Sequence, residues 1–312
     1  MDRFKFVLYR PLQMIPVLLG ISIITFVLIH AIPGDPVRTI LGPKATPEVI
    51  ERVRAQYGLD RPVLVQYLYF VRNLAHGEMG RSIVYKTGVA GLVLERLQAT
   101  VFLLAYGVVL ALMLTVPLAV TAALRQGRPI DHAIRMFSTA GLGFPAFWLG
   151  IMLMIVFSVR LGLFPVSGYG DGALGHLHHL FLPALAIALP LSAILTRNLR
   201  ASLLAELDSD YVNAARAKGL PARWIFARHV FRNSLIPTIN LLGVNLGWLI
   251  GGTVVIETVF SVPGLGSLMV SSIFARDYMV VQAITLAFAV ATVLINFVID
   301  LATVALDPRI EL

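Results

Sequence analysis

The sequence predicts an all-α integral membrane protein with about six transmembrane helices. Hydrophobic residues make up 58% of the 312 residues and charged residues only 13%, with a mean hydropathy of +0.83. A soluble domain of this length would need more charge to cover its surface. The apolar residues form continuous runs without the alternation of a membrane β-barrel. Cations in the loops beside these runs account for the net charge of +8, which therefore does not indicate nucleic-acid binding.

Six apolar runs are candidate spans, at residues 11–32, 98–124, 136–159, 180–196, 235–256 and 280–306. The first run is as long as a hydrocarbon core of about 30 Å and lacks a small-residue cleavage site, so we expect a permanent helix rather than a signal peptide. The fourth run is short and contains Pro183 and Pro190, which predicts a kinked or re-entrant shape.

The distribution of cations predicts the orientation. An even number of spans places both termini on one side, and with the termini inside, the inner segments carry 14 Lys and Arg in 65 residues against 11 in 108 residues outside. This excess predicts cytoplasmic N- and C-termini. We expect three parts: residues 1–32 with the first helix, an outer loop at 33–97, and a five-helix core at 98–312.

The outer loop contains two predicted helices. A proline-led start at residues 46–48 precedes apolar residues that share one helix face, with Gly58 as the stop: Val49, Ile50, Val53 and Tyr57. A second stretch, 63–75, repeats apolar residues at intervals of three and four: Leu64, Tyr67, Leu68, Val71 and Leu74. Both patterns suit amphipathic helices on the outer membrane face or on the protein.

A polar island at residues 197–234 separates the fourth and fifth runs. It carries seven Lys and Arg against three Asp and Glu, which is typical of a cytoplasmic loop open to a soluble partner. Ser209 or Asp210 can cap a helix there, and Gly219 followed by Pro221 ends it in a sharp turn. A second amphipathic segment follows, with one face expected at Trp224, Ala227 and Phe231. We expect two short helices that meet at Gly219 and form a compact knob.

The run Asn213-Ala214-Ala215-Arg216-Ala217-Lys218-Gly219 resembles the cytoplasmic coupling loop of bacterial ABC importer permeases, whose pattern is Glu-Ala-Ala, three residues, then Gly. Asn replaces Glu here. The generic Ile-x-Leu-Pro end is absent at 229–232, and Leu-Ile-Pro occurs instead at 235–237. Both departures resemble the dipeptide and oligopeptide branch of the superfamily.

Five further segments resemble the same branch, in the same order along the chain: residues 32–36, 57–62, 260–266, 276–278 and 307–309. The resemblance is to the first permease subunit of dipeptide, glutathione and nickel importers. It implies a type I importer permease fold in the bacterial inner membrane. The implied cargo is di- or oligopeptides or glutathione, with nickel as the alternative.

The resemblance also implies the partners, besides membrane lipid. These are a homologous second permease, two cytoplasmic ATPase subunits and a binding protein that delivers cargo. The loop 33–97 is either a docking surface for the binding protein or packs over the helix bundle. The chain has no Gly-x4-Gly-Lys-Ser/Thr run, so we expect no cofactor here and ATP with Mg²⁺ on the ATPases. The residues expected to contact the ATPases are Asp210, Asn213, Ala214, Ala215, Lys218, Gly219, Leu220 and Trp224.

Polar residues inside the spans are candidates for the translocation path, because exposing them to lipid is costly. The candidates are Asn240, Asn245, Glu257 and Asn296, with interhelical bonding as the alternative for the asparagines and a solvated helix end for Glu257. Asp300, one helical turn after Asn296, is expected to pair structurally. Three glycines spaced by four residues predict a close-packing helix face, for which a contact with the second permease is one use: Gly243, Gly247 and Gly251.

Three histidines form the one candidate metal site in the sequence: His176, His178 and His179. Histidine is common at the edge of a membrane, and we expect no metal site here. The absence of cysteine excludes disulfides and thiolate sites. An ion-coupled secondary transporter would be expected to show an inverted repeat and a buried carboxylate pair, and neither is evident. An intramembrane enzyme would need a nucleophile and base within the spans, and His30 has no evident partner.

Overall fold

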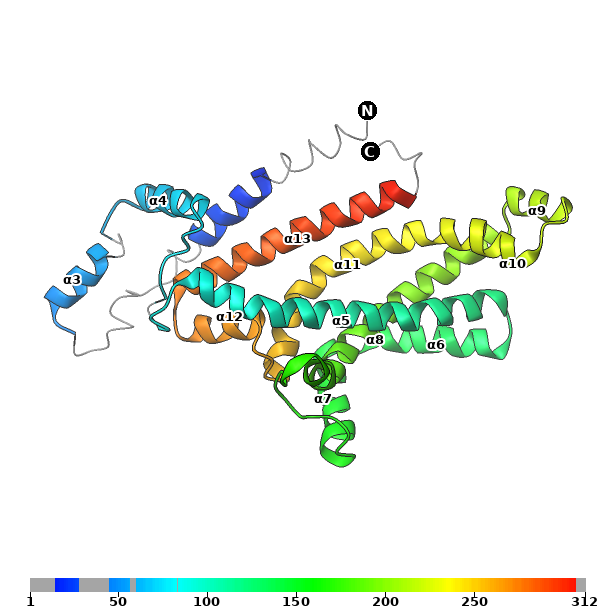
Figure 1. The fold of residues 1–312 in the computed structure, drawn as a ribbon, viewed down its shortest axis with the longest axis horizontal. Helices are drawn as coiled ribbons and strands as arrows, with labels where there is room; N and C mark the ends of the chain where they lie inside the picture. Colours follow the sequence, from blue (N-terminus) through cyan, green and yellow to red (C-terminus); the bar gives the residue numbers. More distant parts are fainter. Residues whose placement is uncertain (1–14, 28–44, 57–59, 83, 307–312) are drawn as a thin grey trace. The chain divides into compact units, whose positions relative to one another are not determined.

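The computed structural model describes residues 15–27, 45–56, 60–82 and 84–306, and these are helical apart from turns and one isolated bridge between Arg81 and Gly88 (Figure 1). A helix over Ile15–Val27 comes first. The elements that follow are α3 (Pro47–Gln56), α4 (Val63–Ala75), α5 (Val89–Leu124), α6 (Pro129–Gly143), α7 (Ala146–Leu153), the π-helix η1 (Met154–Arg160), α8 (Gly172–Leu207), α9 (Asp210–Ala217), α10 (Ala222–Ile225), the π-helix η2 (Phe226–Phe231), α11 (Arg232–Val259), α12 (Leu265–Phe274) and α13 (Tyr278–Leu306).

The predicted all-α membrane fold is confirmed. By length and composition, four described helical runs can cross a membrane: Val89–Leu124, Gly172–Leu207, Ala222–Val259 and Tyr278–Val304. A fifth crossing results if α6 and the run Ala146–Arg160 form one broken span. The first predicted span, 11–32, is described only over Ile15–Val27, so the described residues account for four or five of the six expected spans.

The sharp bend lies in the third predicted span and not in the fourth. The axes of α6 and Ala146–Arg160 differ by 104°. Phe144 is extended (φ −109°, ψ 130°), as the residue before a proline tends to be, and Pro145 then precedes α7. The short length and the re-entrant shape considered for the fourth span were wrong, because α8 continues through Pro183 and Pro190 for 36 residues. The alternative of a kink at these prolines stays a prediction. At about 1.5 Å per residue, α8 extends several turns beyond a hydrocarbon core of about 30 Å.

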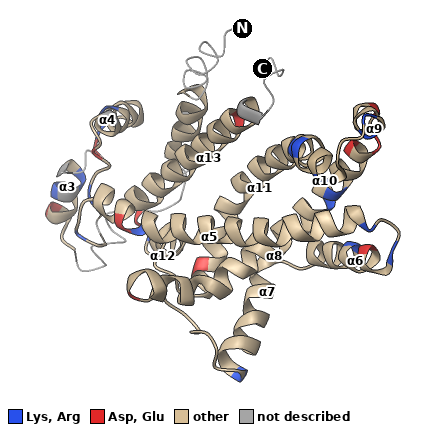
Figure 2. Cartoon of the chain, turned by 45° about the vertical axis from the view of Figure 1, so that its right-hand side comes forward, with Lys and Arg blue, Asp and Glu red and all other residues tan. Residues whose placement is uncertain are grey.

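The chain forms two compact units, and α5 and α13 each contribute a part to both. Unit 1 consists mainly of residues 101–262 and those from 292 onward. Its central helix is α8, which packs against α6, α7 and α11. The core of this unit joins buried residues of α5, α8 and α11: Ala111, Ala188, Leu191, Leu195 and Leu242. The charged side chains of this unit gather around α9, α10 and the start of α6 (Figure 2).

Of the three glycines on the predicted face of α11, only Gly243 makes a close contact with α13 among the described residues. A Cβ at Gly243 would lie 2.8 Å from Ile299 Cγ2 of α13, whereas one at Gly247 would lie 3.6 Å from Thr292 Cγ2. For a Cβ at Gly251, the described residues place no such neighbour within 4 Å. The first of the three glycines therefore serves the packing of α11 on α13 within this chain.

This difference predicts unequal effects of equal substitutions. Gly243→Leu overpacks the α11–α13 contact at an expected cost of about 1–3 kcal/mol and is expected to lower the apparent Tm of the purified protein. Gly251→Leu is the matched control, and its Tm should stay within about 1 °C of the wild type because the site is open. A melting series in detergent checks both, and equal Tm values for the two variants would contradict the packing described here.

Unit 2 consists mainly of residues up to 100 and of 263–291. Its core brings the start of α5 together with α12 and the start of α13: Val89, Leu92, Val93, Leu265, Leu268, Val280, Ala283 and Ile284. Asp277, buried to 1% exposure, accepts hydrogen bonds from Ser82 Oγ and from Val84 N (3.3 Å). The carboxylate thus holds the turn that precedes α5 against the start of α13.

The two helices predicted in the outer loop are confirmed. α4 has the predicted bounds, Val63–Ala75, and α3 starts at Pro47, with the amides of Val49 and Ile50 bonded to the Thr46 carbonyl at 3.1 Å. In unit 2, Tyr67 of α4 lies against the helix Ile15–Val27, where its hydroxyl is 2.9 Å from Ser22 Oγ and its ring centroid is 5.3 Å from that of Phe26. These contacts show α4 packing on protein. The predicted stop at Gly58 lies outside the described residues.

Candidate functional site

The predicted knob is present at residues 208–231, between α8 and α11 (Figure 1). α9 ends as predicted at Gly219, which has a φ of +76°. The Gly219 amide bonds the Arg216 carbonyl at 2.9 Å and the Leu220 amide bonds the Ala215 carbonyl at 3.3 Å, the pair of bonds of a Schellman motif. Because glycine adopts positive φ without a Cβ penalty, Gly219 fixes this turn.

The start of α9 differs from the prediction. Ser209 occupies the N-cap position, but its side chain does not cap the helix and Ser209 Oγ instead donates to the Glu206 carbonyl at 2.6 Å. Asp210 is the first residue of α9 and places a carboxylate at the positive end of the helix dipole.

The face of the second segment also differs from the prediction. Of the three residues expected to share one face, Trp224 and Ala227 are exposed and Phe231 is half-buried. The buried residues of this stretch are Ile225, Val230 and Ser234. The cause is the π-helix η2, which widens the turn and places Val230 five residues after Ile225 on the buried side. The knob therefore presents Trp224 outward.

The knob is anchored through a core of its own in unit 1. Val212 of α9, Ile225 of α10 and Val230 of η2 are fully or almost fully buried against the ends of α5 and α8. The residues they meet there are Ala119, Ala123, Leu199 and Leu203. Ala215 packs partly against the same cluster, so only part of the small-residue face is free. The knob is thus fixed to α8 and not loosely tethered.

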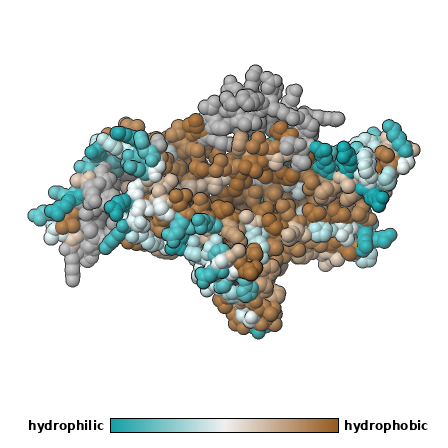
Figure 3. All heavy atoms as spheres, in the orientation of Figure 1, coloured by the Kyte–Doolittle hydropathy of each residue, from teal (hydrophilic) through white to brown (hydrophobic). Residues whose placement is uncertain are grey.

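The outer surface of the knob carries most of the residues predicted to contact an ATPase. Of these, only Ala215 is half-buried, and the following are exposed: Asp210, Asn213, Ala214, Lys218, Gly219, Leu220 and Trp224. Figure 3 shows hydrophilic residues over α9, in contrast to the hydrophobic surface over α11. Leu220 and Trp224 are 39% and 42% exposed in this polar setting. Exposed large side chains of this kind are suited to anchoring a protein partner.

A polar and aromatic cluster lies beside Trp224. The Tyr211 hydroxyl donates to Glu206 Oε2 and accepts from Asn233 Nδ2 at 3.1 Å. The ring centroids of Trp224 and His229 lie 5.1 Å apart. Burial raises the pKa of Tyr211, and the hydrogen bond to the Glu206 carboxylate raises that pKa further. Tyr211 therefore stays a hydrogen-bond donor at physiological pH and ties α9 to the end of α8 and the start of α11.

The four residues predicted for the translocation path have different surroundings. Asn240 Oδ1 accepts from Thr303 Oγ1 of α13 at 2.7 Å, and Asn245 Nδ2 bonds the carbonyl of Leu241 in its own helix at 2.7 Å. Asn296 is exposed. Glu257 is fully buried in unit 1, so the solvated helix end considered for it was wrong. Their role in a path stays a prediction.

The three histidines lie in the first turns of α8, each bonded to a backbone carbonyl. His176 Nδ1 is 2.9 Å from Tyr169 O, His178 Nε2 is 3.1 Å from Leu163 O, and His179 Nδ1 is 3.0 Å from Gly175 O. Within the described part of the chain, no group of three His, Asp or Glu is placed to hold a metal ion. Instead, two of the contacts tie the preceding loop to α8.

We therefore expect that replacing His176, His178 and His179 with glutamine leaves nickel uptake by cells unchanged. Glutamine retains one hydrogen-bonding group at each position and binds metals poorly. Uptake of radioactive nickel, normalised to the amount of permease in the membrane, checks this. A loss of uptake with normal permease levels would instead support metal capture by the histidines.

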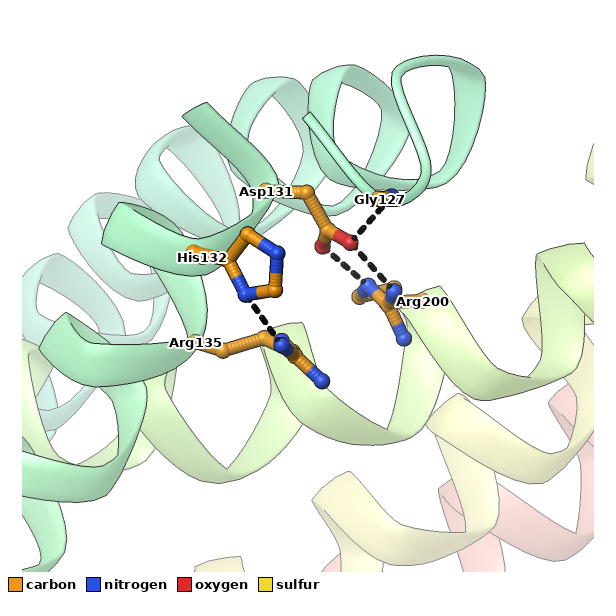
Figure 4. Close-up of polar contacts among 5 residues, drawn as sticks. All are labelled: Gly127, Asp131, His132, Arg135 and Arg200. Carbon is orange, nitrogen blue, oxygen red and sulfur yellow. Dashed lines mark hydrogen bonds and ion pairs between the residues drawn. The ribbon is translucent and has the colours of Figure 1, made fainter. Parts of the chain in front are cut away.

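Sequence reasoning missed one polar contact of unit 1. Asp131, in the first turn of α6, is 1% exposed and forms a two-point ion pair with Arg200 of α8 (Figure 4). The distances are 2.6 Å from Nε to Oδ1 and 2.7 Å from an Nη atom to Oδ2. The two residues are 69 positions apart, and an acidic residue amid the cations at 125–135 is the only signal in the sequence.

Two family models cover most of the chain. Residues 115–312 match the binding-protein-dependent transport system inner membrane component, and residues 3–104 match the N-terminal part of such membrane components. The chain belongs to this permease family. The knob lies within the first match, and the chain is accordingly a permease subunit of an ABC importer. The family is one of transport permeases, and not the ion-coupled transporters considered as an alternative.

Several relatives are similar over the whole length. The oligopeptide transport system permease protein AppB of Bacillus subtilis (strain 168) is 41% identical over 312 residues, covering 98% of this chain and 99% of the relative. The glutathione transport system permease protein GsiC of Escherichia coli (strain K12) is 38% identical over 307 residues, with 98% and 99% covered.

Solved structures show the same fold at low sequence identity. An inward-facing MetNI methionine ABC transporter matches with a TM-score of 0.58 and 16% identity over 69% of this chain and 96% of that chain. An amino acid ABC transporter with histidines matches with a TM-score of 0.53 and 17% identity over 68% and 93%. The expected importer permease fold is therefore confirmed.

Proposed function

We propose that this permease forms half of the translocation path for di- or oligopeptides or glutathione, paired with a homologous second permease. Two ATPase subunits hold ATP and Mg²⁺ and drive the cycle, and a binding protein delivers the cargo. The relatives AppB and GsiC, named for oligopeptide and glutathione transport, support this range of cargo. Nickel has less support, because the histidines are engaged with backbone carbonyls.

The knob is the observation that carries the proposal. It combines a rigid Gly219 turn, exposed small residues and two exposed hydrophobic anchors on a polar surface. In the proposed mechanism the knob seats in a groove of an ATPase subunit, with Leu220 and Trp224 as anchors and Ala214 and Gly219 permitting close approach. Nucleotide-driven closure of the ATPases then displaces the knob, and α8, to which the knob is anchored, transmits the displacement to the bundle.

The orientation follows from this mechanism. The knob and the cation-rich segment 125–135 face the cytoplasm in our proposal, together with both termini, in agreement with the excess of Lys and Arg on that side. Single cysteines can test this, because the chain has none of its own. A cysteine at Lys218 is expected to react with a membrane-impermeant maleimide only after the cells are opened, and labelling in intact cells would contradict the orientation.

The cargo is tested through the binding protein. We expect a gene for the binding protein next to the gene for this chain, together with genes for a second permease and for ATPases. The purified binding protein should retain a peptide or glutathione, as identified by mass spectrometry, and should raise ATP hydrolysis by the reconstituted complex when loaded with that ligand. A binding protein that retains only nickel would contradict the proposed cargo.

A further inference from the structure

In unit 1, outside the knob, an ion pair joins Asp131 of α6 to Arg200 of α8 (Figure 4). The guanidinium meets the carboxylate in the planar two-point geometry that fixes orientation as well as distance. Gly127 N donates to Asp131 Oδ2 at 3.0 Å, which adds the turn before α6 to the same contact. The carboxylate is 2% and the guanidinium side chain 16% exposed, so water screens the pair little.

The rest of the seam between α6 and α8 is tightly packed. Asp131, Ile134 and Ser138 form the buried face of α6. Farther along the same face, a Cβ at Gly141 would lie only 2.9 Å from Ala193 Cβ of α8. At Gly141 the two helices are too close for a larger side chain. Near the start of α6 the ion pair joins them. Such a seam resists both separation and sliding.

The same stretch of α8 carries the knob. Leu199 and Leu203, on either side of Arg200 in sequence, are fully buried in the cluster that holds Val212 of the knob. One short segment of α8 thus contacts the knob through its leucines and α6 through its arginine. Displacement of the knob acts first on this segment.

We propose that Asp131 and Arg200 are positioning residues that make α6 move as one body with α8 and the knob during the transport cycle. This inference rests on the proposed function, because it assigns a route for the motion that the ATPases impose on the knob. α6 is the helix that precedes the 104° bend at residues 144–145, so the link carries knob motion to the bent segment of the bundle.

The test replaces the ion pair with a reversible covalent link. Removing both charges in D131C/R200C avoids leaving one charge buried and unpaired, which is the strongly destabilising case. The chain has no cysteine of its own, so within this chain a short bis-methanethiosulfonate reagent joins only these two positions, and dithiothreitol releases them. The wild-type complex treated with the same reagent controls for cysteines in the other subunits. The complete complex is reconstituted in vesicles with its binding protein, loaded in separate samples with trialanine and with glutathione, and ATP hydrolysis and cargo uptake are measured together.

We expect the unlinked D131C/R200C complex to import about tenfold less cargo per ATP hydrolysed than the wild type. Cross-linking should restore at least half of the wild-type ratio, and dithiothreitol should abolish the recovery. The double variant D131C/R200C, treated with a monofunctional methanethiosulfonate that cannot join the two cysteines, controls for modification alone and should show no recovery. A wild-type ratio in the unlinked variant, or no recovery after cross-linking, would overturn the proposal.

If the double variant does not assemble, the R200K variant tests the same proposal. Lysine keeps the charge but cannot make the two-point contact, so the cargo imported per ATP should fall two- to fivefold at an unchanged amount of complex. A full wild-type ratio in R200K would overturn the proposal. The wild-type complex distinguishes a failure of the proposed function from a failure of the proposed role of the ion pair. A wild-type complex whose ATP hydrolysis is not stimulated by cargo contradicts the proposed function itself.

Discussion

Replacing Gly219 with valine is expected to lower cargo-stimulated ATP hydrolysis by the assembled importer more than tenfold. A β-branched residue is strongly disfavoured at the φ of +76° that Gly219 adopts, so the Schellman turn between α9 and α10 has to change shape. Apart from the two residues next to Gly219, no atom in the described part of the chain lies within 4 Å of the position that a Cβ would occupy. The variant should therefore reach the membrane in normal amounts and lose coupling rather than folding.

Gly77 provides a matched control for this prediction. It follows α4 with a φ of +78° and has the same pair of bonds, from Gly77 N to Leu74 O and from Glu78 N to Asn73 O. It also has open space around its Cβ position. Gly77→Val thus imposes similar strain in unit 2 and should keep most of the stimulated hydrolysis. Equal losses in the two variants, at equal amounts of complex, would mean that the Gly219 turn has no special role.

Truncating the hydrophobic anchors of the knob is expected to weaken its binding to the ATPase subunits. Trp224→Ala removes an exposed side chain of a type enriched at interface hot spots, at an expected cost of about 2 kcal/mol, or about 30-fold in Kd. Leu220→Ala removes a smaller apolar contact, at an expected cost of about 1 kcal/mol, or about fivefold in Kd. The binding of purified ATPase to the permease pair in nanodiscs, followed by biolayer interferometry, measures this change.

Trp248 is the matched control for Trp224. It lies on α11, outside the knob, and is 81% exposed. Trp248→Ala should leave the Kd for the ATPase within about twofold of the wild type. An unchanged Kd for both Leu220→Ala and Trp224→Ala would contradict the proposed anchoring role, even if Gly219→Val behaves as expected.

The knob could largely be predicted from the sequence because its signals are local. Gly219 and Pro221 determine where α9 ends, and the spacing of small residues identifies the loop. The positions that are buried in the second segment, Ile225 and Val230, could not be predicted, because they depend on the π-helix η2. A helical period of 3.6 residues assigns the wrong face when a turn is widened by tertiary packing.

The membrane helices show a similar limit. Their apolar runs predict that they exist, but prolines alone do not predict where they break. Pro183 and Pro190 lie within α8, whereas Pro145 follows an extended residue and coincides with the 104° bend. A proline inside a bundle is tolerated when neighbouring groups satisfy the freed carbonyls, and a single sequence does not reveal those neighbours.

Contacts between distant residues are the least predictable part. Neither Asp131 nor Arg200 stands out in the sequence as half of an ion pair. Asp131 reads as an acidic residue in a loop, and Arg200 reads as one of the cations on the inner side. Their pairing follows only from the antiparallel packing of α6 on α8. The same holds for Gly243, whose close contact with Ile299 distinguishes it from Gly251 in the same glycine pattern.

Site-specific cross-linking of the knob tests the central claim most directly. Because the chain has no cysteine, a single cysteine at Ala214 or Lys218 can carry a photoactivated cross-linker at one defined point. In membranes that contain the complete importer, both positions are expected to cross-link to an ATPase subunit, with a yield that changes when ATP is added, and a cysteine at Trp248 is not. Cross-linking to the ATPase from Trp248 but not from Ala214 or Lys218 would contradict the account.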